Sequence, residues 1–297
     1  MSLIIYAIDR EIMAILITGA TGTIGRPLVD ALAREGAEVR AVTRDPEASG
    51  LPAGVDVVTG DPSRPDTIAS SLKGVTSVFL HPRAVGEAAA DLLALAREHG
   101  VERVVALSAI NVDDDPAEQP SRFQGDRNKE AEAAAVGSGL EWVSLRCASF
   151  AVNTLFTWAP QIRAGDIVRG PYATFAEPLI HERDVAEVAA RALSDAGLTG
   201  ERLRLTGPQF LSHEELVAEI GTVIGRPLRY AEIPPEAFSR AMIERGLPRP
   251  FVEALMARYA RGVGPAEAVT GEVERILGRP ARTYPEWAAD HAAAFQN

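Results

Sequence analysis

Gly19, Gly22 and Gly25 have the spacing G-x-x-G-x-x-G, after an apolar run at residues 14–18 and at the start of an amphipathic segment, residues 24–35. This order predicts a strand, a tight turn and a helix start. The first turn of a helix presents unpaired N–H groups and the positive end of the helix dipole, which can hold a pyrophosphate. We expect Gly19 to allow the turn, Gly22 to admit phosphate, and Gly25 to let helix and sheet pack closely. The segment predicts a dinucleotide site with further contacts from Thr21, Thr23 and Ile24.

The end of the second expected strand, residues 38–43, selects the cofactor. A carboxylate there suits the ribose 2′-OH of NAD, whereas a cation suits the 2′-phosphate of NADP. Arg44 comes first after the strand, and its guanidinium can pair with phosphate and stack on adenine. Asp45 follows it, before Pro46, and can instead begin a turn. The sequence favours NADP, as NADPH, over NAD; the alternative is that Arg44 is a solvated loop residue.

Asp61 follows the third expected strand, residues 55–59. A carboxylate at this edge of the sheet could accept a hydrogen bond from the adenine amino group. It could equally begin the turn before Pro62. Both interpretations of Asp61, cofactor contact and turn residue, stay open.

Strand-like and helix-like segments alternate from residue 13 onward, which indicates parallel strands joined by helical crossovers. The sequence predicts an α/β fold with a doubly wound parallel sheet, the Rossmann arrangement, and a smaller, mostly helical C-terminal substrate lobe. Ligands bind such sheets at the carboxyl ends of the strands, where strand order reverses. The expected strands are residues 14–18, 38–43, 55–59, 75–80, 101–107, 140–145 and 202–206, and the expected helices are residues 24–35, 65–72, 87–99, 127–136, 181–194 and 212–224.

The alternation weakens after residue 150, and this change suggests the domain boundaries. We expect residues 13–150 and 181–206 to form the NAD(P)-binding domain, and residues 151–180 and 207–297 to form the substrate lobe. Residues 1–12 are interpreted as an N-terminal appendage, because Met13 directly precedes the first strand and would make a natural start.

The motifs resemble the NmrA-like group of atypical short-chain dehydrogenases/reductases over residues 13–230. The resemblance is carried by the glycine motif and by Thr43-Arg44-Asp45, Gly60-Asp61, Lys129, Ser138-Gly139-Leu140, Leu145-Arg146 and Phe150 with Asn153. It implies a Rossmann domain, a small lobe and a substrate cleft between them. Members include NADPH-dependent reductases of quinones and plant phenolics, and NADP sensors without catalysis. The resemblance implies a backbone contact to the nicotinamide at the family's Arg-Pro-Gly, which reads Arg146-Cys147-Ala148 here and so departs from the family's pattern at Cys147 and Ala148.

Hydride transfer to a carbonyl or quinone leaves an oxygen that needs a proton or a positive field. The usual superfamily solution is Tyr-x-x-x-Lys on one helix face. Lys129 fits the lysine position, but Gly125 stands where the tyrosine belongs. Ser108 matches the region of the usual catalytic serine. Three proton sources stay open: Lys129, if burial near the cofactor makes it a donor; Tyr172 or His81 from the substrate side; or water, if the acceptor is a quinone.

Each catalytic candidate also has a structural interpretation. Lys129 could be a surface helix residue, His81 a turn residue before Pro82, and Tyr172 a loop or core aromatic. Aromatic residues flank the expected cleft and could form an apolar pocket, although core packing explains them equally well. These residues are Phe123, Phe150, Phe156, Trp158 and Phe175.

Two functions fit these residues. The first is an NADPH-dependent reductase of a small apolar carbonyl, quinone or activated alkene, in which Lys129 orients the nicotinamide ribose or supplies positive charge. The alternative is a non-catalytic NADP(H)-sensing regulator that binds a protein partner, which the missing tyrosine favours. An epimerase of nucleotide sugars needs that tyrosine and is disfavoured.

The composition limits the classes of partner. The 297 residues include 30 basic and 41 acidic ones, a formal net charge of -11, which argues against nucleic-acid binding as the main task. A single cysteine, Cys147, and five histidines without metal-ligand spacing predict no disulfide within the chain and no metal. No apolar run approaches a membrane span and no signal peptide is visible, so we expect a cytoplasmic protein with a small apolar substrate.

Overall fold

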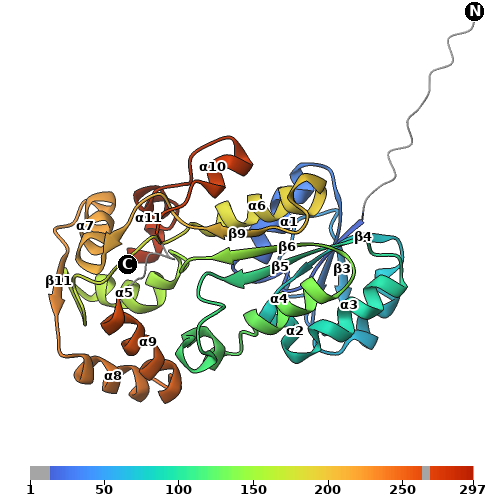
Figure 1. Ribbon diagram of the computed structural model, residues 1–297. Helices are drawn as coiled ribbons and strands as arrows, with labels where there is room; N and C mark the ends of the chain where they lie inside the picture. The colour runs from blue at the N-terminus through green and yellow to red at the C-terminus, as the bar shows by residue number, and fades with distance from the viewer. Residues whose placement is uncertain (1–13, 263–267, 297) are drawn as a thin grey trace, which may run out of the picture.

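The computed structural model describes residues 14–262 and 268–296, and a seven-stranded sheet forms its centre (Figure 1). The strands lie in the order β3-β2-β1-β4-β5-β6-β9, and every neighbouring pair is parallel. The order reverses between β1 and β4, the position at which such sheets bind ligands. The strands are β1 (Ala14–Ile17), β2 (Glu38–Thr43), β3 (Asp56–Thr59), β4 (Val75–Leu80), β5 (Arg103–Ala109), β6 (Glu141–Cys147) and β9 (Arg202–Leu205).

Helices cover both faces of this sheet (Figure 1). On one face lie α1 (Gly25–Arg34) and α6 (Glu182–Ser194). On the other lie α2 (Pro82–Val85), α3 (Ala89–Glu98) and α4 (Asn128–Gly137). In α1, Leu28 and Leu32 stand one turn apart and are both buried, which gives this helix the apolar stripe that holds it on the sheet.

Burial on both faces explains the unbroken apolar sequence of β1. Each residue from Ala14 to Ile17 is at most 2% exposed. Ile15 and Ile17 belong to the core shared with α1 and α6, whereas Ala14 and Leu16 belong to the core shared with α3 and α4. A strand covered on both sides shows no alternation of apolar and polar residues.

A smaller lobe lies beyond the carboxyl end of β6 (Figure 1). Its core contains Trp158, Ile162, Leu216, Ile220 and Trp287. The lobe is mostly helical, as predicted, with two short sheets in which β7 pairs with β11 and β8 with β10. Its elements are α5 (Asn153–Ala164), β7 (Ile167–Gly170), β8 (Ala176–Glu177), β10 (Leu211–Ser212), α7 (His213–Ile224), β11 (Arg229–Glu232), α8 (Pro235–Glu244), α9 (Arg249–Arg261) and α11 (Tyr284–Asp290).

The doubly wound sheet and most predicted elements are confirmed, with three adjustments. Both β5 and β6 continue two residues further than predicted, because Glu132 on α4 gives Ser108 and Arg146 a buried partner. Residues 65–72 form a 3-10 helix. The helix expected from residue 181 begins at Glu182, with His181 as its N-cap. The appendage predicted at residues 1–12 lies outside the described residues.

The packing divides the chain differently from the predicted boundary at residue 207. Helix α10 (Glu272–Leu277) places Val273 in the core of the sheet domain, alongside Leu203 and Leu205 of β9. Ile276 and Leu277 pack against the same core. Residues 272–277 therefore belong with the dinucleotide domain, and the chain returns to the lobe only at α11.

Candidate active site

The turn after β1 depends on two of its glycines. Gly19 has a φ of 68°, and a Cβ there would lie 2.9 Å from Cγ of His81. A Cβ on Gly25 would lie 2.1 Å from the carbonyl oxygen of Gly19 and 2.7 Å from Cα of Ala20. Gly25 therefore lets α1 approach the preceding turn, whereas the sequence predicted an approach to the sheet.

The turn also leaves backbone donors open at the start of α1. Thr21, Gly22 and Thr23 are exposed, while the side chain of Ile24 is buried in the core. The N–H of Gly22 donates to the carbonyl of Gly19 at 3.0 Å. In the described part of the chain, the N–H groups of Thr23 and Ile24 have no acceptor, and they lie at the positive end of a ten-residue helix. This cradle fits a pyrophosphate.

The loop after β2 carries the predicted specificity residue. Arg44 is exposed. The carboxylate of Asp45 accepts the N–H of Ala48 at 3.1 Å, so Asp45 begins a turn, as one interpretation anticipated. Arg26 of α1 donates to two carbonyls at the end of this loop, that of Gly50 at 2.7 Å. The loop is thus closed within itself and tied to the first turn of α1.

Asp61 has the turn role that was one of its two predicted roles. Its carboxylate accepts the hydroxyl of Ser63 at 2.7 Å and the N–H of Ser63 at 3.0 Å, which makes it a turn residue. The Ser63 hydroxyl, with smaller contributions from Arg64 and Arg44, lowers the pKa of Asp61 despite partial burial. The carboxylate therefore stays charged beside Arg44, at the ends of two adjacent strands.

His81 lies against the glycine turn. The backbone N–H of His81 donates to the hydroxyl of Thr18 at 2.8 Å. Its ring nitrogen Nδ1 accepts the backbone N–H of Arg83 at 3.3 Å. A neutral ring in this arrangement carries its proton on Nε2. Burial lowers the pKa of His81, partly offset by the charge of Asp126. His81 is thus the turn residue that was anticipated, capping α2, and also a neighbour of Gly19.

The helix that carries Lys129 explains why no tyrosine precedes it. Helix α4 begins at Asn128, and Gly125 lies before it with a φ of 98°. Position 125 is therefore not on the same helix face as Lys129. Lys129 itself is exposed. The burial that would make it a proton donor is not provided by the described residues.

A buried carboxylate one turn further along α4 was not found from the sequence. Glu132 accepts hydrogen bonds from Ser108 at 2.9 Å, from Ser144 at 2.6 Å and from Arg146 at 2.6 Å. Arg202 of β9 also donates to it, at 3.0 Å. Glu132 therefore joins α4 to three strands, β5, β6 and β9.

This network changes the interpretation of Ser108, which was predicted to be a site residue. Ser108 is 3% exposed and its hydroxyl donates to Glu132, so its side chain is not directed to an open cleft. Burial would raise the pKa of Glu132, but the hydrogen bonds from Arg146, Ser144, Ser108 and Arg202 outweigh it and lower the pKa to about 2. The only sequence signal was an acidic residue inside an alanine-rich helix, followed by a strand that contains an arginine.

Cys147 and Ala148 can offer only their backbone. The side chain of Cys147 lies in the sheet core, and burial raises the pKa of its thiol. Its carbonyl accepts the N–H of Ile110 at 2.9 Å, and the N–H of Ala148 donates to Leu205 at 2.8 Å. The Cys147 carbonyl and the Ala148 N–H are therefore already hydrogen-bonded within the sheet domain. Of the groups named here, the Ala148 carbonyl is the one left to contact a nicotinamide.

Tyr172 lies in the lobe with a φ of 51°, the only positive value among the non-glycine residues that the structure describes. Its ring meets that of Tyr259 edge-on at 6.2 Å. It lines a cavity of about 720 Å³ whose other walls come from α8 and α9. Neither His81 nor Lys129 lines this cavity. The structure therefore separates Tyr172 from the other two catalytic candidates.

The aromatic residues near the expected cleft divide into two groups. Trp158 and Phe175 are buried and pack around His213 in the lobe, so the core interpretation holds for them. Phe156 is 58% exposed. Phe123 and Phe150 are half-buried.

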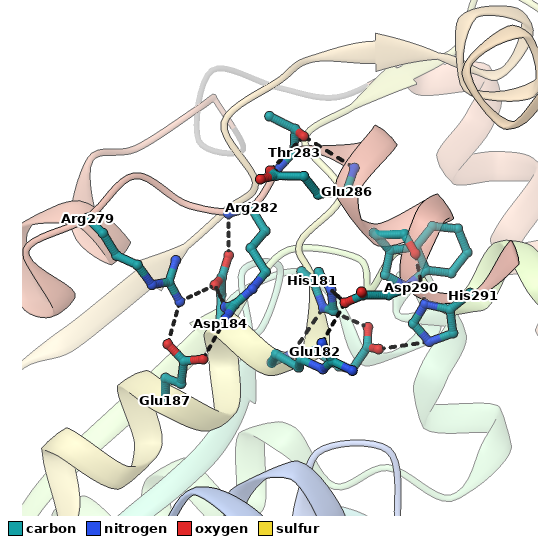
Figure 2. Close-up of polar contacts among 12 residues, drawn as sticks. His181, Glu182, Asp184, Glu187, Arg279, Arg282, Thr283, Glu286, Asp290 and His291 are labelled. Carbon is teal, nitrogen blue, oxygen red and sulfur yellow. Dashed lines mark hydrogen bonds and ion pairs between the residues drawn. The ribbon is translucent and has the colours of Figure 1, made fainter. Parts of the chain in front are cut away.

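Ion pairs fasten the C-terminal segment to α6 (Figure 2). Asp184 is fully buried and pairs with Arg279 at 2.7 Å and with Arg282. Glu187, one turn later, pairs with the same two arginines. The segment that leads into α11 is thereby held on the dinucleotide domain.

Two histidines continue this contact (Figure 2). Nε2 of His291 lies 3.1 Å from Glu182, and Nε2 of His181 lies 3.3 Å from Asp290. Since His181 and Glu182 belong to the start of α6, and Asp290 and His291 to the end of α11, these pairs join the sheet domain to the lobe.

Comparison with known proteins identifies the family. A family model described as NAD(P)H-binding matches residues 19–196. The chain belongs to this NAD(P)H-binding family. The match begins at the first glycine of the turn and ends just after α6, so it spans β2 to β6 of the central sheet and leaves out β1 and β9. The predicted resemblance to NAD(P)-binding reductases is confirmed, and NAD(P)H is the cofactor.

Two of the relatives that the chain resembles are named as reductases. The chain is 36% identical over 284 residues to a (4-alkanoyl-5-oxo-2,5-dihydrofuran-3-yl)methyl phosphate reductase of Streptomyces griseus, covering 95% of this chain and 99% of that one. It is 34% identical over 290 residues to an NAD(P)H azoreductase of Xenophilus azovorans, with the same coverage. The fold is similar to the NADPH-dependent quinone oxidoreductase QOR2 of Escherichia coli complexed with NADPH (TM-score 0.78, 24% identity, 94% and 99% covered).

The described residues contain neither a membrane-spanning helix nor a group of side chains that could bind a metal ion. None of the helices there has both the length and the apolar character needed to cross a membrane. Nor do three or more His, Cys, Asp or Glu side chains there gather in a way that could hold a metal ion.

Proposed function

We propose that this chain is an NADPH-dependent reductase of a small apolar carbonyl, quinone or activated alkene. The observation that carries the proposal is the glycine turn with open N–H groups at the strand reversal, in a chain with two relatives that are named as reductases. The exposed Arg44 at the end of β2 supports NADPH over NADH, because a guanidinium pairs with the 2′-phosphate.

Gly125 favours acceptors that do not need a strong protein acid. Hydride addition to an isolated carbonyl concentrates negative charge on one oxygen, which the missing tyrosine would have protonated. Addition to a quinone, or to an alkene conjugated with a carbonyl, spreads that charge over the π system, and the second hydrogen can arrive as a proton from water. The relatives' names, which include an azoreductase and a furanone with a conjugated ring alkene, point the same way.

Each candidate residue then has a defined task. The bound cofactor supplies the hydride. The N–H groups of Thr23 and Ile24 hold its pyrophosphate. The carboxylate of Asp61 accepts a hydrogen bond from the adenine amino group. Lys129 orients the nicotinamide ribose or supplies positive charge, and the Nε2–H of His81 is a protein donor beside the glycine turn.

The test is NADPH oxidation followed with a panel of three acceptors: a quinone, a butenolide with a conjugated alkene, and a simple aldehyde. We expect turnover with the quinone or the butenolide and little with the aldehyde. Lys129→Ala should reduce kcat, with Lys73→Ala, another exposed lysine, as the control. Unchanged turnover in Lys129→Ala would remove this residue from the site.

The sensor remains the alternative, favoured by Gly125 in the tyrosine position. Tight NADPH binding without turnover on any acceptor would support it over the reductase. Absence of binding to both NADPH and NADH would contradict both functions.

A further inference from the structure

A second cavity in the lobe, of about 340 Å³, lies between α5 and α8. Pockets for small molecules have volumes of about 300–1,000 Å³, so this one suits a compact ligand. All its lining residues belong to the lobe, so it is separate from the glycine turn. Its apolar lining consists of Phe156, Ile233, Phe238, Ala241, Met242 and Leu247.

The charge of this cavity is unusual for the chain. Its lining contains Arg169 of β7 and Arg245 after α8, but no Asp or Glu. Within residues 14–262 and 268–296, neither guanidinium makes an ion pair. The whole chain carries a net charge of -11, and the larger cavity beside Tyr172 is lined by three glutamates together with two arginines. Two unpaired cations on an apolar floor favour an anion with an apolar body.

One wall of the cavity, formed by α5 and β7, is held in place before any ligand binds. Gln161 of α5 accepts the N–H of Arg169 at 2.9 Å and donates to its carbonyl at 3.1 Å, which ties α5 to β7. Phe156, one turn earlier on α5, is 58% exposed at the rim. An exposed aromatic ring gains from being covered, and a preformed wall reduces the entropy lost on binding.

We propose that this cavity binds a small amphipathic anion, independently of the reductase site. The aromatic or acyl body of the ligand packs against Phe156, Phe238 and Met242. Its carboxylate, phosphate or sulfonate accepts hydrogen bonds from Arg169 and Arg245. The shared chemistry is a single anionic group on a compact apolar body.

The probe for this proposal is 8-anilino-1-naphthalenesulfonate, compared with the neutral N-phenyl-1-naphthylamine. Fluorescence titrations are run on the full chain with excess NADP⁺, which is not fluorescent and occupies the dinucleotide site. We expect the sulfonate to bind more tightly than the neutral probe. In the double variant Arg169→Gln/Arg245→Gln, its affinity should fall about tenfold or more, since charge-assisted hydrogen bonds are lost. The neutral probe should keep its affinity within about twofold.

Two controls locate the effect. Arg240→Gln removes an arginine from the larger cavity and should leave both probes unchanged. Ala241→Trp fills the smaller cavity and should weaken both probes. Equal binding of the two probes by the wild type, or an unchanged sulfonate affinity in the double variant, would overturn the proposal. These measurements record binding alone, so they stand apart from success or failure of the reductase test.

Discussion

Gly25 faces Gly19 so closely that a Cβ on Gly25 would lie 2.1 Å from the Gly19 carbonyl oxygen. Backbone atoms cannot move aside as the end of a flexible side chain can. A Cβ on Gly22 would lie 3.2 Å from the same oxygen, a contact that a small shift relieves. The two glycines therefore have different roles. Gly25 makes the turn sterically possible, and Gly22 leaves the outer surface of the turn free of side chains.

Gly25→Ala should destabilise the protein by about 3 kcal/mol, because the start of α1 must move away from the turn. Gly22→Ala should change the free energy of unfolding by less than about 1 kcal/mol and yet weaken NADPH binding, because its methyl group occupies the path of the phosphate. Chemical denaturation and a cofactor titration of both variants measure this. Equal stability of the two variants would contradict the account.

Arg44 is expected to determine the preference for NADPH. Arg44→Gln removes a charge-assisted hydrogen bond to the 2′-phosphate, which is worth about 1.5–3 kcal/mol, so NADPH affinity should fall by about tenfold or more. NADH affinity should change little. Arg64→Gln is the control, since Arg64 is also exposed and lies 3.4 Å from Asp61. If Arg44→Gln lowers the affinities for NADPH and NADH equally, Arg44 shapes the loop and does not recognise the 2′-phosphate.

Glu132 should make stability depend on acid pH. Its pKa of about 2 lies below the ordinary value of 4.5, so its contribution is complete above pH 4.5 and is lost as the pH falls towards 2. At pH 7, Glu132→Gln should cost about 3 kcal/mol, because Arg146 and Arg202 lose their buried partner. The difference from wild type should shrink between pH 4.5 and pH 2.

Glu141→Gln is the matched control for this series, since Glu141 pairs with Arg103 but has a side chain that is 49% exposed. Its effect on stability at pH 7 should be small. Urea denaturation of the three proteins across the pH range measures the result. A gap between wild type and Glu132→Gln that stays constant down to pH 2 would show that Glu132 is not held charged.

The glycine turn could be predicted because its causes are local. Gly25 acts on Gly19, six positions earlier, Gly19 has the positive φ that the turn requires, and the apolar run before them marks the strand. The Glu132 network could not be predicted in the same way, because Ser108 and Arg202 lie 24 and 70 positions away from it in the chain. Such a partner set is fixed only when the strands are ordered into a sheet.

The same distinction explains what happened to two of the catalytic candidates and to α10. His81 was found because it follows a strand, and the fold places it against Gly19. Tyr172 was chosen from a stretch of turn signals without a clear period, and its ring packs against α9, an element that the pattern did not resolve. The position of α10 was missed because a six-residue helix gives too short an apolar pattern to show which core it covers.

His291 should give the contact between α6 and α11 a pH dependence near neutrality. The hydrogen bond to Glu182 raises the pKa of His291 above its ordinary value of 6.5, against the effect of partial burial. The groups that face it are Glu182, Asp290 and His181. A raised pKa means that the stabilisation is complete below pH 6.5 and is lost as the pH rises through the higher folded value.

The variant His291→Gln should therefore be less stable than wild type by about 1 kcal/mol at pH 6, and the difference should shrink as the pH rises above 6.5. His99→Gln is the matched control. In both residues Nδ1 lies 2.9 Å from the carbonyl four positions earlier, but no carboxylate pairs with His99 in the part of the chain that the structure describes. Denaturation curves from pH 5.5 to 8.5 compare the two. A difference for His291→Gln that grows with pH would reverse the sign and contradict the pairing with Glu182.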